Sequence, residues 1–406
     1  MLELTIDGRR VEVKEGTTIL EAACMVGVEI PTLCYDPRLR PYGACRMCLV
    51  ETEGNPKLLP ACTTPATNRM VVRTDNERIR KVRKMLLEMQ TLHHPLDCPV
   101  CDAAGACGLQ DLVYELGVDM NRFKGERRHV PYDSRSPLIE RNVNRCILCA
   151  KCVRICDEVQ GVGAINVSYR GYDTDVGPPF GEPLDCEFCG QCWSVCPVGA
   201  LNSRLAKFKG RSWVLEHTPT VCPYCGTGCS FDLQVHPTKK EIVRVEAKVG
   251  TGINNGNLCG KGRFGYEFVH STDRLREPLI RRNGKLEAAT WDEALSYVGY
   301  RFNEIKRAHG AKSIGGLGSG RCTNEENYLF QRFMRQVIGT NNIDSCARLG
   351  HVDWLEGMRR ACGTFAIGGE IGSAARAGAI LVVESNITET NPVLSLDVLR
   401  AARFGG

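Results

Sequence analysis

The residues of this sequence that could do chemistry are above all its cysteines. The chain has 23 cysteines in 406 residues, and most of them stand in closely spaced groups. Thiolates are ligands for iron and zinc, and in a reducing compartment so many thiols serve as metal ligands rather than as disulfides. We therefore expect several metal centres on one chain, and the spacing within each group indicates their type.

The most specific group is a pair of motifs with the spacing C-x2-C-x2-C-x3-C. The first motif is Cys146, Cys149, Cys152 and Cys156, and the second, followed by proline, is Cys186, Cys189, Cys192 and Cys196. This is the run of bacterial ferredoxins with two [4Fe–4S] clusters, in which the fourth cysteine of each motif ligates the cluster of the other. We therefore predict that Cys196 completes the first cluster and that Cys156 completes the second. Asp157 stands where the first motif often has proline, which removes a backbone constraint but no ligand.

A group near the N-terminus has a close pair of cysteines in a glycine-containing loop, YGACRMC, and two more distant partners. Its members are Cys34, Cys45, Cys48 and Cys62. Zinc is the rival metal for any site of four cysteines. The wide outer spacings and the β-rich surroundings favour a [2Fe–2S] cluster of the plant-ferredoxin type, whose sulfurs need backbone N–H donors nearby.

The stretch HHPLDCPVCDAAGACG supplies three cysteines, one thiolate short of a complete set. They are Cys98, Cys101 and Cys107. Imidazole is a competent iron ligand, so a histidine just upstream can complete the site, although an isolated histidine is more often structural. We predict a [4Fe–4S] cluster on these three thiolates and His94, rather than on the adjacent His93.

A further group spans CPYCGTGC and the later NLCGKG. It comprises Cys222, Cys225, Cys229 and Cys259. The spacing would also suit a zinc ribbon, but the neighbouring groups favour another [4Fe–4S] cluster. Four cysteines remain outside the groups, and we expect them to be buried as small apolar residues: Cys24, Cys322, Cys346 and Cys362.

The first cysteine group lies in a segment that predicts a hairpin and a helix. LELTIDGRRVEV predicts two antiparallel strands joined at the turn pair Asp7-Gly8. The following TTILEAACMVG predicts a helix opened by a capping box of Thr18 and Glu21.

A longer helix is predicted at NERIRKVRKMLLEMQTLHH. Thr74 and Glu77 have the spacing of a second capping box at its start. The apolar residues recur at helical spacing: Ile79, Val82, Leu86 and Met89. The Arg and Lys residues between them are expected on the solvated face, and a docking patch for an acidic partner is the lesser alternative.

From about residue 272 the sequence has an ordinary α/β pattern. AKSIGGLGSG predicts a strand that runs into a glycine loop, CTNEENYLFQRFMRQVIG predicts a helix opened by Thr323 and Glu326, and AGAILVVESN predicts a buried strand. The glycine loop departs from G-x-G-x-x-G because Arg321 occupies its last position. A tight strand–helix turn is therefore favoured over a nucleotide site.

The charge of the chain is nearly balanced. Lys and Arg number 52 against 47 Asp and Glu, a net charge of +5, which is no footprint for nucleic acid or membrane. No run approaches the ~18 consecutive apolar residues of a membrane span, and MLELTIDGRR lacks the apolar core of a signal peptide. We expect a cytoplasmic protein that binds no nucleic acid and has no membrane span of its own.

Five clusters on one chain predict a path for electrons. Iron–sulfur centres carry one electron at a time, so such a path is useful between two-electron chemistries such as those of hydride, hydrogen or formate. An electron-transfer subunit of a larger oxidoreductase is therefore the leading hypothesis. A free-standing redox sensor is a minor alternative.

The motifs between residues 34 and 196 resemble the iron–sulfur region shared by three families. These are the large cluster-bearing subunit of respiratory complex I, the iron-only hydrogenases and the alpha subunit of NAD-linked formate dehydrogenases; HHPLDCPVC is similar to the motif of one histidine and three cysteines in all three. TVCPYCGTGCSFDL, NLCGKGRFGYEFVHSTDRLREPLIR, CTNEENYLFQRF and GTNNIDSCARLGH continue the resemblance to formate dehydrogenase into its molybdopterin domain. The likeness covers essentially the whole chain.

Two departures from the formate dehydrogenase pattern bear on catalysis. In that family the pattern is Cys-Ala-Arg-x-(Cys or selenocysteine)-His, and its fifth residue ligates molybdenum or tungsten; here Gly350 follows Cys346, Arg348 and Leu349 and precedes His351, and glycine offers no ligand. The resemblance also breaks off at NPVLSLDVLRAARFGG, before most of the pterin-binding fold. Lys261 matches the family's lysine between cluster and pterin, but we expect no molybdopterin, and no iron-only hydrogenase signature follows residue 210.

The resemblance implies an α+β multi-domain fold. We expect a β-grasp [2Fe–2S] ferredoxin domain, a helical domain with the histidine-ligated cluster, a two-cluster ferredoxin domain, a small cluster-binding domain and a truncated, non-catalytic α/β domain like that of molybdopterin oxidoreductases. The expected boundaries are 1–78, 79–120, 138–209, 215–271 and 272–406.

The resemblance also implies partners and a function. The chain would conduct electrons between an NAD(P)- and FMN-binding flavoprotein subunit and a separate catalytic subunit, a hydrogenase ahead of a formate dehydrogenase. The resemblance further implies two partners, a small thioredoxin-like [2Fe–2S] subunit and ferredoxin. It also implies electron bifurcation as the chemistry of the complex. The alternative is that the chain is itself the catalytic alpha subunit, or a fragment, of a molybdenum or tungsten formate dehydrogenase.

Overall fold

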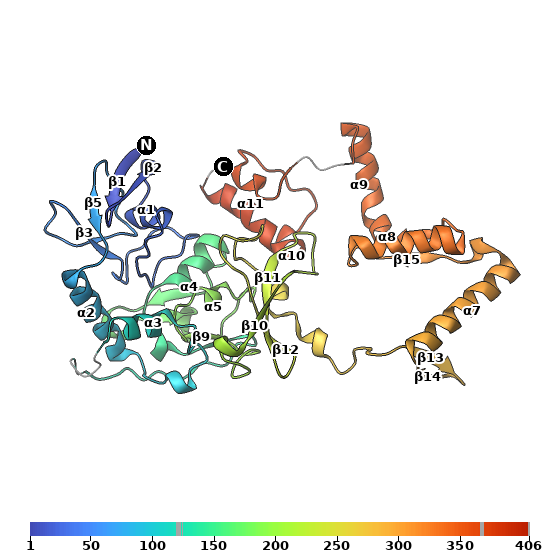
Figure 1. Ribbon diagram of the computed structural model, residues 1–406, viewed down its shortest axis with the longest axis horizontal. Helices are drawn as coiled ribbons and strands as arrows, with labels where there is room; N and C mark the ends of the chain where they lie inside the picture. The colour runs from blue at the N-terminus through green and yellow to red at the C-terminus, as the bar shows by residue number, and fades with distance from the viewer. Residues whose placement is uncertain (119–122, 124, 366–368, 405–406) are drawn as a thin grey trace. The chain divides into compact units, whose positions relative to one another are not determined.

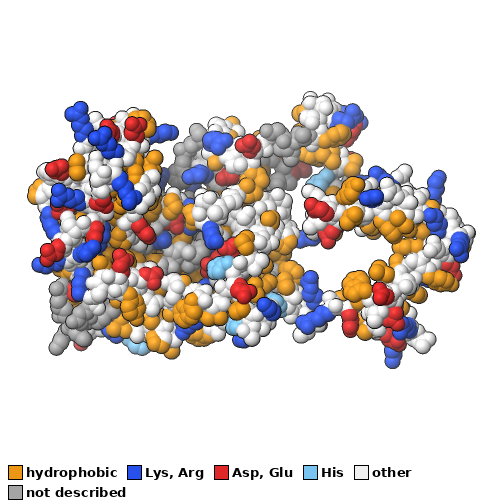
Figure 2. All heavy atoms as spheres, in the orientation of Figure 1, with side chains coloured by type: hydrophobic (Ala, Val, Ile, Leu, Met, Phe, Trp, Pro, Cys, Tyr) orange, Lys and Arg blue, Asp and Glu red, His pale blue; other side chains and the backbone are white. Residues whose placement is uncertain are grey.

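The computed structural model describes residues 1–118, 123, 125–365 and 369–404. It has two compact units, residues 1–266 with 371–406 and residues 267–370. Residues 119 and 120, at the end of the domain predicted at 79–120, and residues 405 and 406 lie outside the described part. No helix of the described residues is both long and apolar enough to cross a membrane. Basic and acidic side chains are interspersed on the face seen in Figure 2.

The N-terminal domain is a mixed sheet with one helix against it (Figure 1). The strand order is β2-β1-β5-β3-β4. The strands are β1 (Leu2–Ile6), β2 (Arg9–Val13), β3 (Leu49–Thr52), β4 (Leu59–Pro60) and β5 (Val71–Arg73). The predicted hairpin is confirmed, with Asp7 and Gly8 at positive φ in its turn. Helix α1 (Ile19–Met25) begins with the predicted capping box of Thr18 and Glu21.

Helix α2 (Glu77–His93) is present, but its predicted cap is wrong. Asn76 caps the helix by accepting a hydrogen bond from the Ile79 N–H. Thr74 lies outside the helix because Asp7 holds it: the Thr74 N–H donates to Asp7 Oδ1 over 2.8 Å. The side chain of Asp7 thereby ties the β1–β2 turn to the segment that leads into α2.

The expected division of α2 into an apolar and a solvated face is also wrong in part. Met89 is half exposed, whereas Leu87 is fully buried. Arg83 is buried and donates to the main-chain oxygens of Met47, Leu49 and Thr74. A buried guanidinium that satisfies three carbonyls fixes α2 against the loop that carries the first cysteine group.

The ferredoxin part is built around two short antiparallel strands and two short helices. The elements are β6 (Ile139–Arg141), β9 (Leu201–Ser203), α4 (Lys151–Arg154) and α5 (Gln191–Ser194). A π-helical turn, Ile155–Val159, continues α4, and β7 (Asn166–Ser168) pairs with β8 (Asp175–Gly177). Helix α3 (Gly108–Glu115) follows the second cysteine group and contacts α2.

The fourth cysteine group lies beside a three-stranded antiparallel sheet. Its strands are β10 (Glu216–Val221), β11 (Ser230–His236) and β12 (Glu241–Glu246), in that order. The short helix α6 (Gly260–Phe264) packs on β12. Buried Val243 and Val245 of β12 supply apolar contacts for this layer.

The unit of residues 267–370 contains long helices and short strands. The helices are α7 (Trp291–His309), α8 (Asn324–Arg332) and α9 (Ala347–Cys362). β13 (Leu279–Arg282) pairs with β14 (Lys285–Ala288), and β15 (Gly316–Gly318) pairs in parallel with β16 (Ile343–Ser345). The predicted strand into the glycine loop and the capping box of Thr323 and Glu326 are confirmed.

The buried strand predicted at residues 377–386 is wrong. These residues form no strand, and Leu381 and Val383 are 87% and 68% exposed. An apolar run becomes a stable strand only where a neighbour accepts and donates its main-chain hydrogen bonds, and none of the strands described pairs with this segment. Helices α10 (Ile387–Thr390) and α11 (Pro392–Phe404) follow it.

The expected burial of the four isolated cysteines is also wrong. Cys24, Cys322, Cys346 and Cys362 are all exposed. In α1 the buried face is supplied by Ile19, Leu20, Ala22 and Ala23. Cys24 therefore falls on the solvent side of its helix, since one face of this short helix meets the sheet.

Candidate iron–sulfur sites

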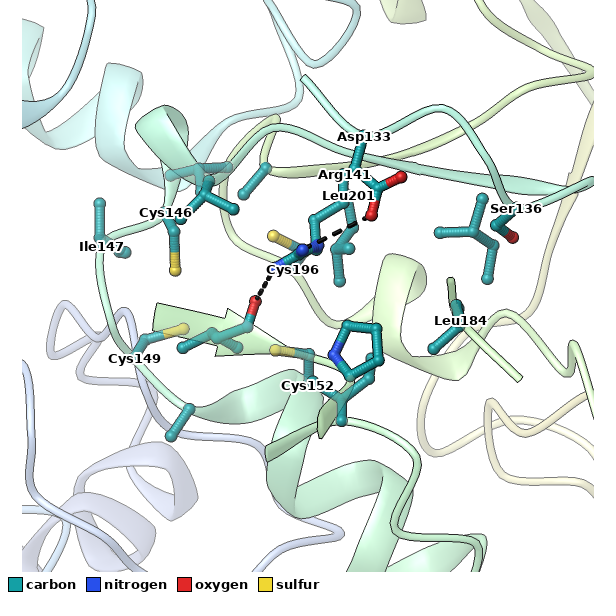
Figure 3. A pocket seen from close by; sticks show the side chains of 18 residues that line it. Asp133, Ser136, Arg141, Cys146, Ile147, Cys149, Cys152, Leu184, Cys196 and Leu201 are labelled. Atoms are coloured by element: carbon teal, nitrogen blue, oxygen red, sulfur yellow. Dashed lines mark hydrogen bonds and ion pairs between the residues drawn. The ribbon is translucent and has the colours of Figure 1, made fainter. Parts of the chain in front are cut away.

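The cysteines predicted for the first ferredoxin cluster line one cavity. They are Cys146, Cys149, Cys152 and Cys196. Figure 3 shows their sulfur atoms directed toward a common space. The other lining residues are mostly apolar, among them Ile139 and Ile165. Burial raises the pKa of Cys146 and of Cys149 to about 12, so a thiolate here needs a compensating cation.

The cysteines predicted for the second ferredoxin cluster line a second cavity. They are Cys156, Cys186, Cys189 and Cys192. Each cavity thus combines three cysteines of one motif with the fourth cysteine of the other. The same local geometry opens both motifs: Leu148 and Phe188 have positive φ, and their N–H groups donate to the sulfurs of Cys146 and Cys186 over 3.4 and 3.3 Å. Such donors stabilise sulfur that carries negative charge.

The first cysteine group converges in a buried loop. All four thiols, those of Cys34, Cys45, Cys48 and Cys62, are buried. Main-chain N–H groups of Leu33 and Cys45 donate to sulfur over 3.4 Å. Thiol contacts with the neighbouring cysteine lower the pKa of Cys34 to about 5 and that of Cys48 to about 7. The same contacts, together with burial, raise the pKa of the partner thiols Cys45 and Cys62. Four thiolates in this loop therefore need a compensating cation, and the loop provides the N–H donors expected around a cluster.

His94 caps the C-terminal end of α2, four residues before Cys98 of the second cysteine group. Its Nδ1 atom is buried and has no hydrogen-bond partner among the described residues. Burial lowers the pKa of His94, opposed by Asp97 and by a hydrogen bond to the Arg145 main chain. A neutral imidazole with one anchored side and one free nitrogen is the form that binds a metal. The adjacent His93 is exposed and packs edge-on against Tyr172.

Cys98, Cys101 and Cys107 lie within electrostatic range of one another, and Asp97 and Arg145 act on both Cys101 and His94. Burial raises the pKa of Cys107 to about 11, and main-chain N–H groups of Leu109 and Gln110 oppose this rise. Gly199 lies against this group, because a Cβ atom there would be 2.4 Å from the sulfur of Cys101. The ferredoxin part therefore packs directly on the second group.

The fourth group also converges. Cys222, Cys225 and Cys259 all act on the thiol of Cys229, whose pKa burial raises to about 12. Cys259 caps α6, where its sulfur accepts a hydrogen bond from the Gly262 N–H over 3.4 Å. Lys261, the residue matched to the pterin-side lysine, is exposed on the same helix.

Among the described residues, no three Cys, His, Asp or Glu side chains form a group compact enough for a single metal ion. The fit to iron–sulfur clusters rests on the donors themselves: groups of thiols, one joined by an imidazole, with main-chain N–H groups nearby. When bound, such clusters supply one-electron redox chemistry. Ligation by each named residue stays a prediction.

The residues matched to a molybdenum or tungsten site form no site in the described structure. Cys346 precedes α9, and Gly350 lies within α9, where a Cβ would meet nothing within 4 Å. His351 is exposed, and exposed Arg348 pairs with Asp344 on the preceding strand. These side chains are solvated.

Neighbouring cysteine groups share packed cores. One core contains Cys34 and Cys45 of the first group, Cys107 of the second and Cys149 of the ferredoxin part. Another contains Cys152 and Cys192, from both ferredoxin cavities, with Phe264 of α6. Leu33 packs on Gly108, and Gly260 packs on the main chain of Phe188. The four groups therefore form one continuous series.

Three buried arginines join these groups, and sequence reasoning missed them. Arg154 donates to the main-chain oxygen of Cys34 over 2.6 Å, and Arg145 pairs with Asp97 beside Cys98. Arg263 donates to the main-chain oxygen of Cys189 over 2.9 Å. Their closeness in sequence to predicted ligands was the available signal, but only the fold reveals which neighbouring group each arginine reaches.

Models of known families match the chain in five consecutive segments. Residues 1–77 match a 2Fe-2S iron-sulfur cluster binding domain, and residues 83–122 match the NADH-ubiquinone oxidoreductase-G iron-sulfur binding region. Residues 136–202 match the ferredoxin-like domain of NADH-quinone oxidoreductase subunit 3. Residues 215–271 match the molybdopterin oxidoreductase Fe4S4 domain, and residues 274–405 match molybdopterin oxidoreductase.

Curated relatives match over nearly the whole of this chain. It is 43% identical to the alpha subunit of NADPH-Fe(3+) oxidoreductase from Geobacter sulfurreducens, over 99% of this chain and 47% of that protein. It is 42% identical to the G 2 subunit of NADH-quinone oxidoreductase from Rhizobium meliloti, over 99% and 46%. The chain thus spans about half the length of these relatives. A chain of an NAD+-reducing [NiFe]-hydrogenase crystal structure matches 52% of it at 32% identity, over 90% of that chain, with a TM-score of 0.48.

Proposed function

We propose that this chain relays electrons through five clusters inside a larger oxidoreductase complex. The chain is an iron–sulfur protein with [2Fe–2S] and [4Fe–4S] domains, and it is related to the G subunits of the NADH-quinone oxidoreductases. One [2Fe–2S] and four [4Fe–4S] clusters would be held by the cysteines named above and His94. The observation that carries the proposal is the sharing of packed cores by neighbouring cysteine groups. Electrons can pass between clusters only where the clusters lie close together, and shared cores supply that closeness.

The proposed donor side is a flavoprotein that takes hydride from NADH or NADPH. Two relatives are named for NADH-quinone and NADPH-Fe(3+) oxidoreductases, which supports this class of donor. A flavin converts a two-electron hydride into single electrons, and one-electron carriers must follow it. A small thioredoxin-like [2Fe–2S] subunit is a further proposed neighbour, and we place the complex in the cytoplasm.

The proposed acceptor side is a separate catalytic subunit, a hydrogenase ahead of a formate dehydrogenase. The motif resemblance to both families supports a catalytic partner of one of these two classes. Ferredoxin as a second donor or acceptor, with electron bifurcation, belongs to the same proposal. The domain boundaries given from the sequence are part of it as well, since the first four domains would each enclose one of the cysteine groups.

The second candidate is a formate-oxidising molybdenum or tungsten enzyme. The match of residues 274–405 to molybdopterin oxidoreductase favours it. Gly350 opposes it, because the position that supplies the metal ligand in that family has no side chain here, and exposed His351 faces no site in the described structure.

Metal analysis of the purified native protein separates the two candidates. The relay predicts about 18 iron atoms per chain, from one [2Fe–2S] and four [4Fe–4S] clusters, and no molybdenum or tungsten. Stoichiometric molybdenum or tungsten would contradict the relay and support the second candidate. Purification of the native complex, with identification of its other subunits, tests the proposed flavoprotein and catalytic partners.

A further inference from the structure

Arg263 is a completely buried cation at the junction of two cysteine groups. It lies on α6, which follows Cys259 of the fourth group, and it is 1% exposed. Its Nε donates to the Cys189 main-chain oxygen over 2.9 Å, and its Nη2 donates to Gln191 Oε1 over 2.6 Å. The fourth group is thus tied by one side chain to the second ferredoxin motif.

The second motif is shaped to admit this side chain. Gly190 has a positive φ, and a Cβ atom there would lie 2.2 Å from Cδ of Arg263. Any larger residue would displace the arginine. The guanidinium also lies over the ring of Trp193, 5.7 Å from its centre, a favourable arrangement for a cation.

The charge of Arg263 is not balanced by its neutral hydrogen-bond partners. Its Nη1 is buried and has no partner among the described residues. A guanidinium stays protonated in proteins, and a buried charge needs an opposite charge nearby. The charged and titratable groups that act on it most strongly are the thiols of Cys189 and Cys192, the carboxylate of Glu246 and the cation of Arg38.

We propose that Arg263 is a positioning residue that holds the fourth cluster site against the second ferredoxin site and, as a buried positive charge, raises the reduction potential of the cluster on Cys156, Cys186, Cys189 and Cys192. The inference rests on the proposed relay, because it requires that both clusters are present. Reduction adds negative charge to a cluster, and a nearby cation in a low-dielectric interior stabilises the reduced form.

The test is a redox titration of the cluster signals by electron paramagnetic resonance in the full chain. The signal of the second ferredoxin cluster is the one that disappears in Cys186→Ala. Arg263→Gln keeps amide donors but loses the charge, and we expect its reduction equilibrium to weaken at least tenfold, a fall of about 59 mV for one electron. Arg263→Lys keeps the charge, and we expect it to retain most of the potential.

Two further variants keep the test decisive if Arg263→Gln does not fold. Glu246→Gln removes the nearby negative charge from a partly exposed side chain, and we expect the same signal to shift in the opposite direction, to higher potential. Lys239→Gln removes one positive charge from the exposed turn between β11 and β12, and no shift is expected.

Iron content separates the failure of this inference from the failure of the relay. If wild-type protein lacks the second ferredoxin cluster, the relay itself fails. If the iron content is that of five clusters and the signal has the same potential in wild type, Arg263→Gln and Glu246→Gln, the inference about Arg263 is overturned and the relay stands. An equal shift in Lys239→Gln would overturn it too, because the effect would then be one of net charge.

Discussion

His94 decides whether the second cysteine group is a complete ligand set. Its buried Nδ1 has no partner among the described residues, and its site holds only three thiols. We predict that His94→Ala loses one [4Fe–4S] cluster, about four iron atoms per chain, with the corresponding paramagnetic signal. Iron analysis of the reconstituted protein and spectra of the reduced protein measure both effects.

His93→Ala is the matched control for this prediction. The side chain of His93 is exposed at the end of the same helix and contacts the ring of Tyr172. We expect the wild-type iron content in this variant. Equal iron content in His94→Ala and His93→Ala would contradict the assignment, and His94→Cys, which supplies a thiolate instead, is expected to retain the iron with an altered spectrum.

Gly199 limits how closely the ferredoxin part can approach the second group. A methyl group at this position would lie 2.4 Å from the sulfur of Cys101 and 3.3 Å from Cβ of Ala103. Overpacking of this kind costs roughly 1–3 kcal/mol, so we expect Gly199→Ala to lower the melting temperature and to weaken binding of the cluster predicted on His94 and the second cysteine group. Thermal unfolding and iron content measure the two effects.

Gly299→Ala is the comparison for Gly199→Ala. Gly299 lies within α7, and a Cβ there would meet nothing within 4 Å. Alanine is favoured over glycine inside a helix by about 1 kcal/mol, so this variant is expected to be neutral or stabilised. A Gly199→Ala protein as stable as wild type, with all its iron, would contradict the prediction and show that Cys101 and Ala103 can move away from the added methyl group at little cost.

At the scale of elements, the two ferredoxin motifs are interleaved rather than adjacent. Each cavity takes three cysteines from one motif and one from the other. We predict that Cys156→Ala and Cys186→Ala each lose about four irons and that the double variant loses no more. Cys156→Ala with Cys196→Ala should lose about eight. Iron analysis of the four variants reads out this pattern.

Uncrossed ligation would change the result for one of these variants, the double variant of Cys156 and Cys186. If each motif held its own cluster, Cys156→Ala with Cys186→Ala would lose both clusters. Cys156 lies on the π-helical turn after α4, and Cys196 follows α5. These turns carry the fourth cysteines across to the opposite cavity, so the outcome tests the arrangement of the elements as well as the ligands.

The sequence predicts the elements here better than it predicts their surroundings. Local signals, such as the Asp7-Gly8 turn and the Thr18 capping box, act within a few residues, and the structure contains both. The cap of α2 depends on Asp7, which lies far away in sequence and binds Thr74. The strand expected at 377–386 depends in the same way on a neighbour that no local pattern reveals.

The cysteine groups could be predicted from the sequence because their spacing is local, whereas the contacts of the buried arginines are long-range and could not. Ligands of one cluster recur at fixed short spacings, because a compact cofactor must be reached by a short loop. Arg154 reaches the main chain of Cys34 across more than a hundred residues of sequence. Its role depends on how two domains pack, and a basic residue between cysteines is otherwise taken as solvated.

At the scale of the molecule, the packed cores show which cysteine groups are neighbours in the proposed electron path. The first and second groups share a core with the first ferredoxin cavity, the two ferredoxin cavities share another, and α6 of the fourth group packs on that second core. The segment of the first group also contacts the loop of the fourth group, because Arg38 donates to Asn257 Oδ1 over 3.2 Å. Each cysteine group therefore has more than one neighbouring group, and the proposed relay can receive and pass on electrons at different parts of the chain.

The proposed relay predicts that the isolated chain stores electrons but oxidises no substrate. Each cluster takes one electron, so we expect a reductive titration of the purified chain to consume about five equivalents, and the Cys186→Ala protein about four. Because the proposed relay takes its flavin from a partner subunit, and Gly350 has no side chain to ligate a metal, we expect no oxidation of NADH, NADPH or formate until partner subunits are added. Formate oxidation by the isolated chain, or an uptake unchanged in Cys186→Ala, would contradict a relay of five clusters.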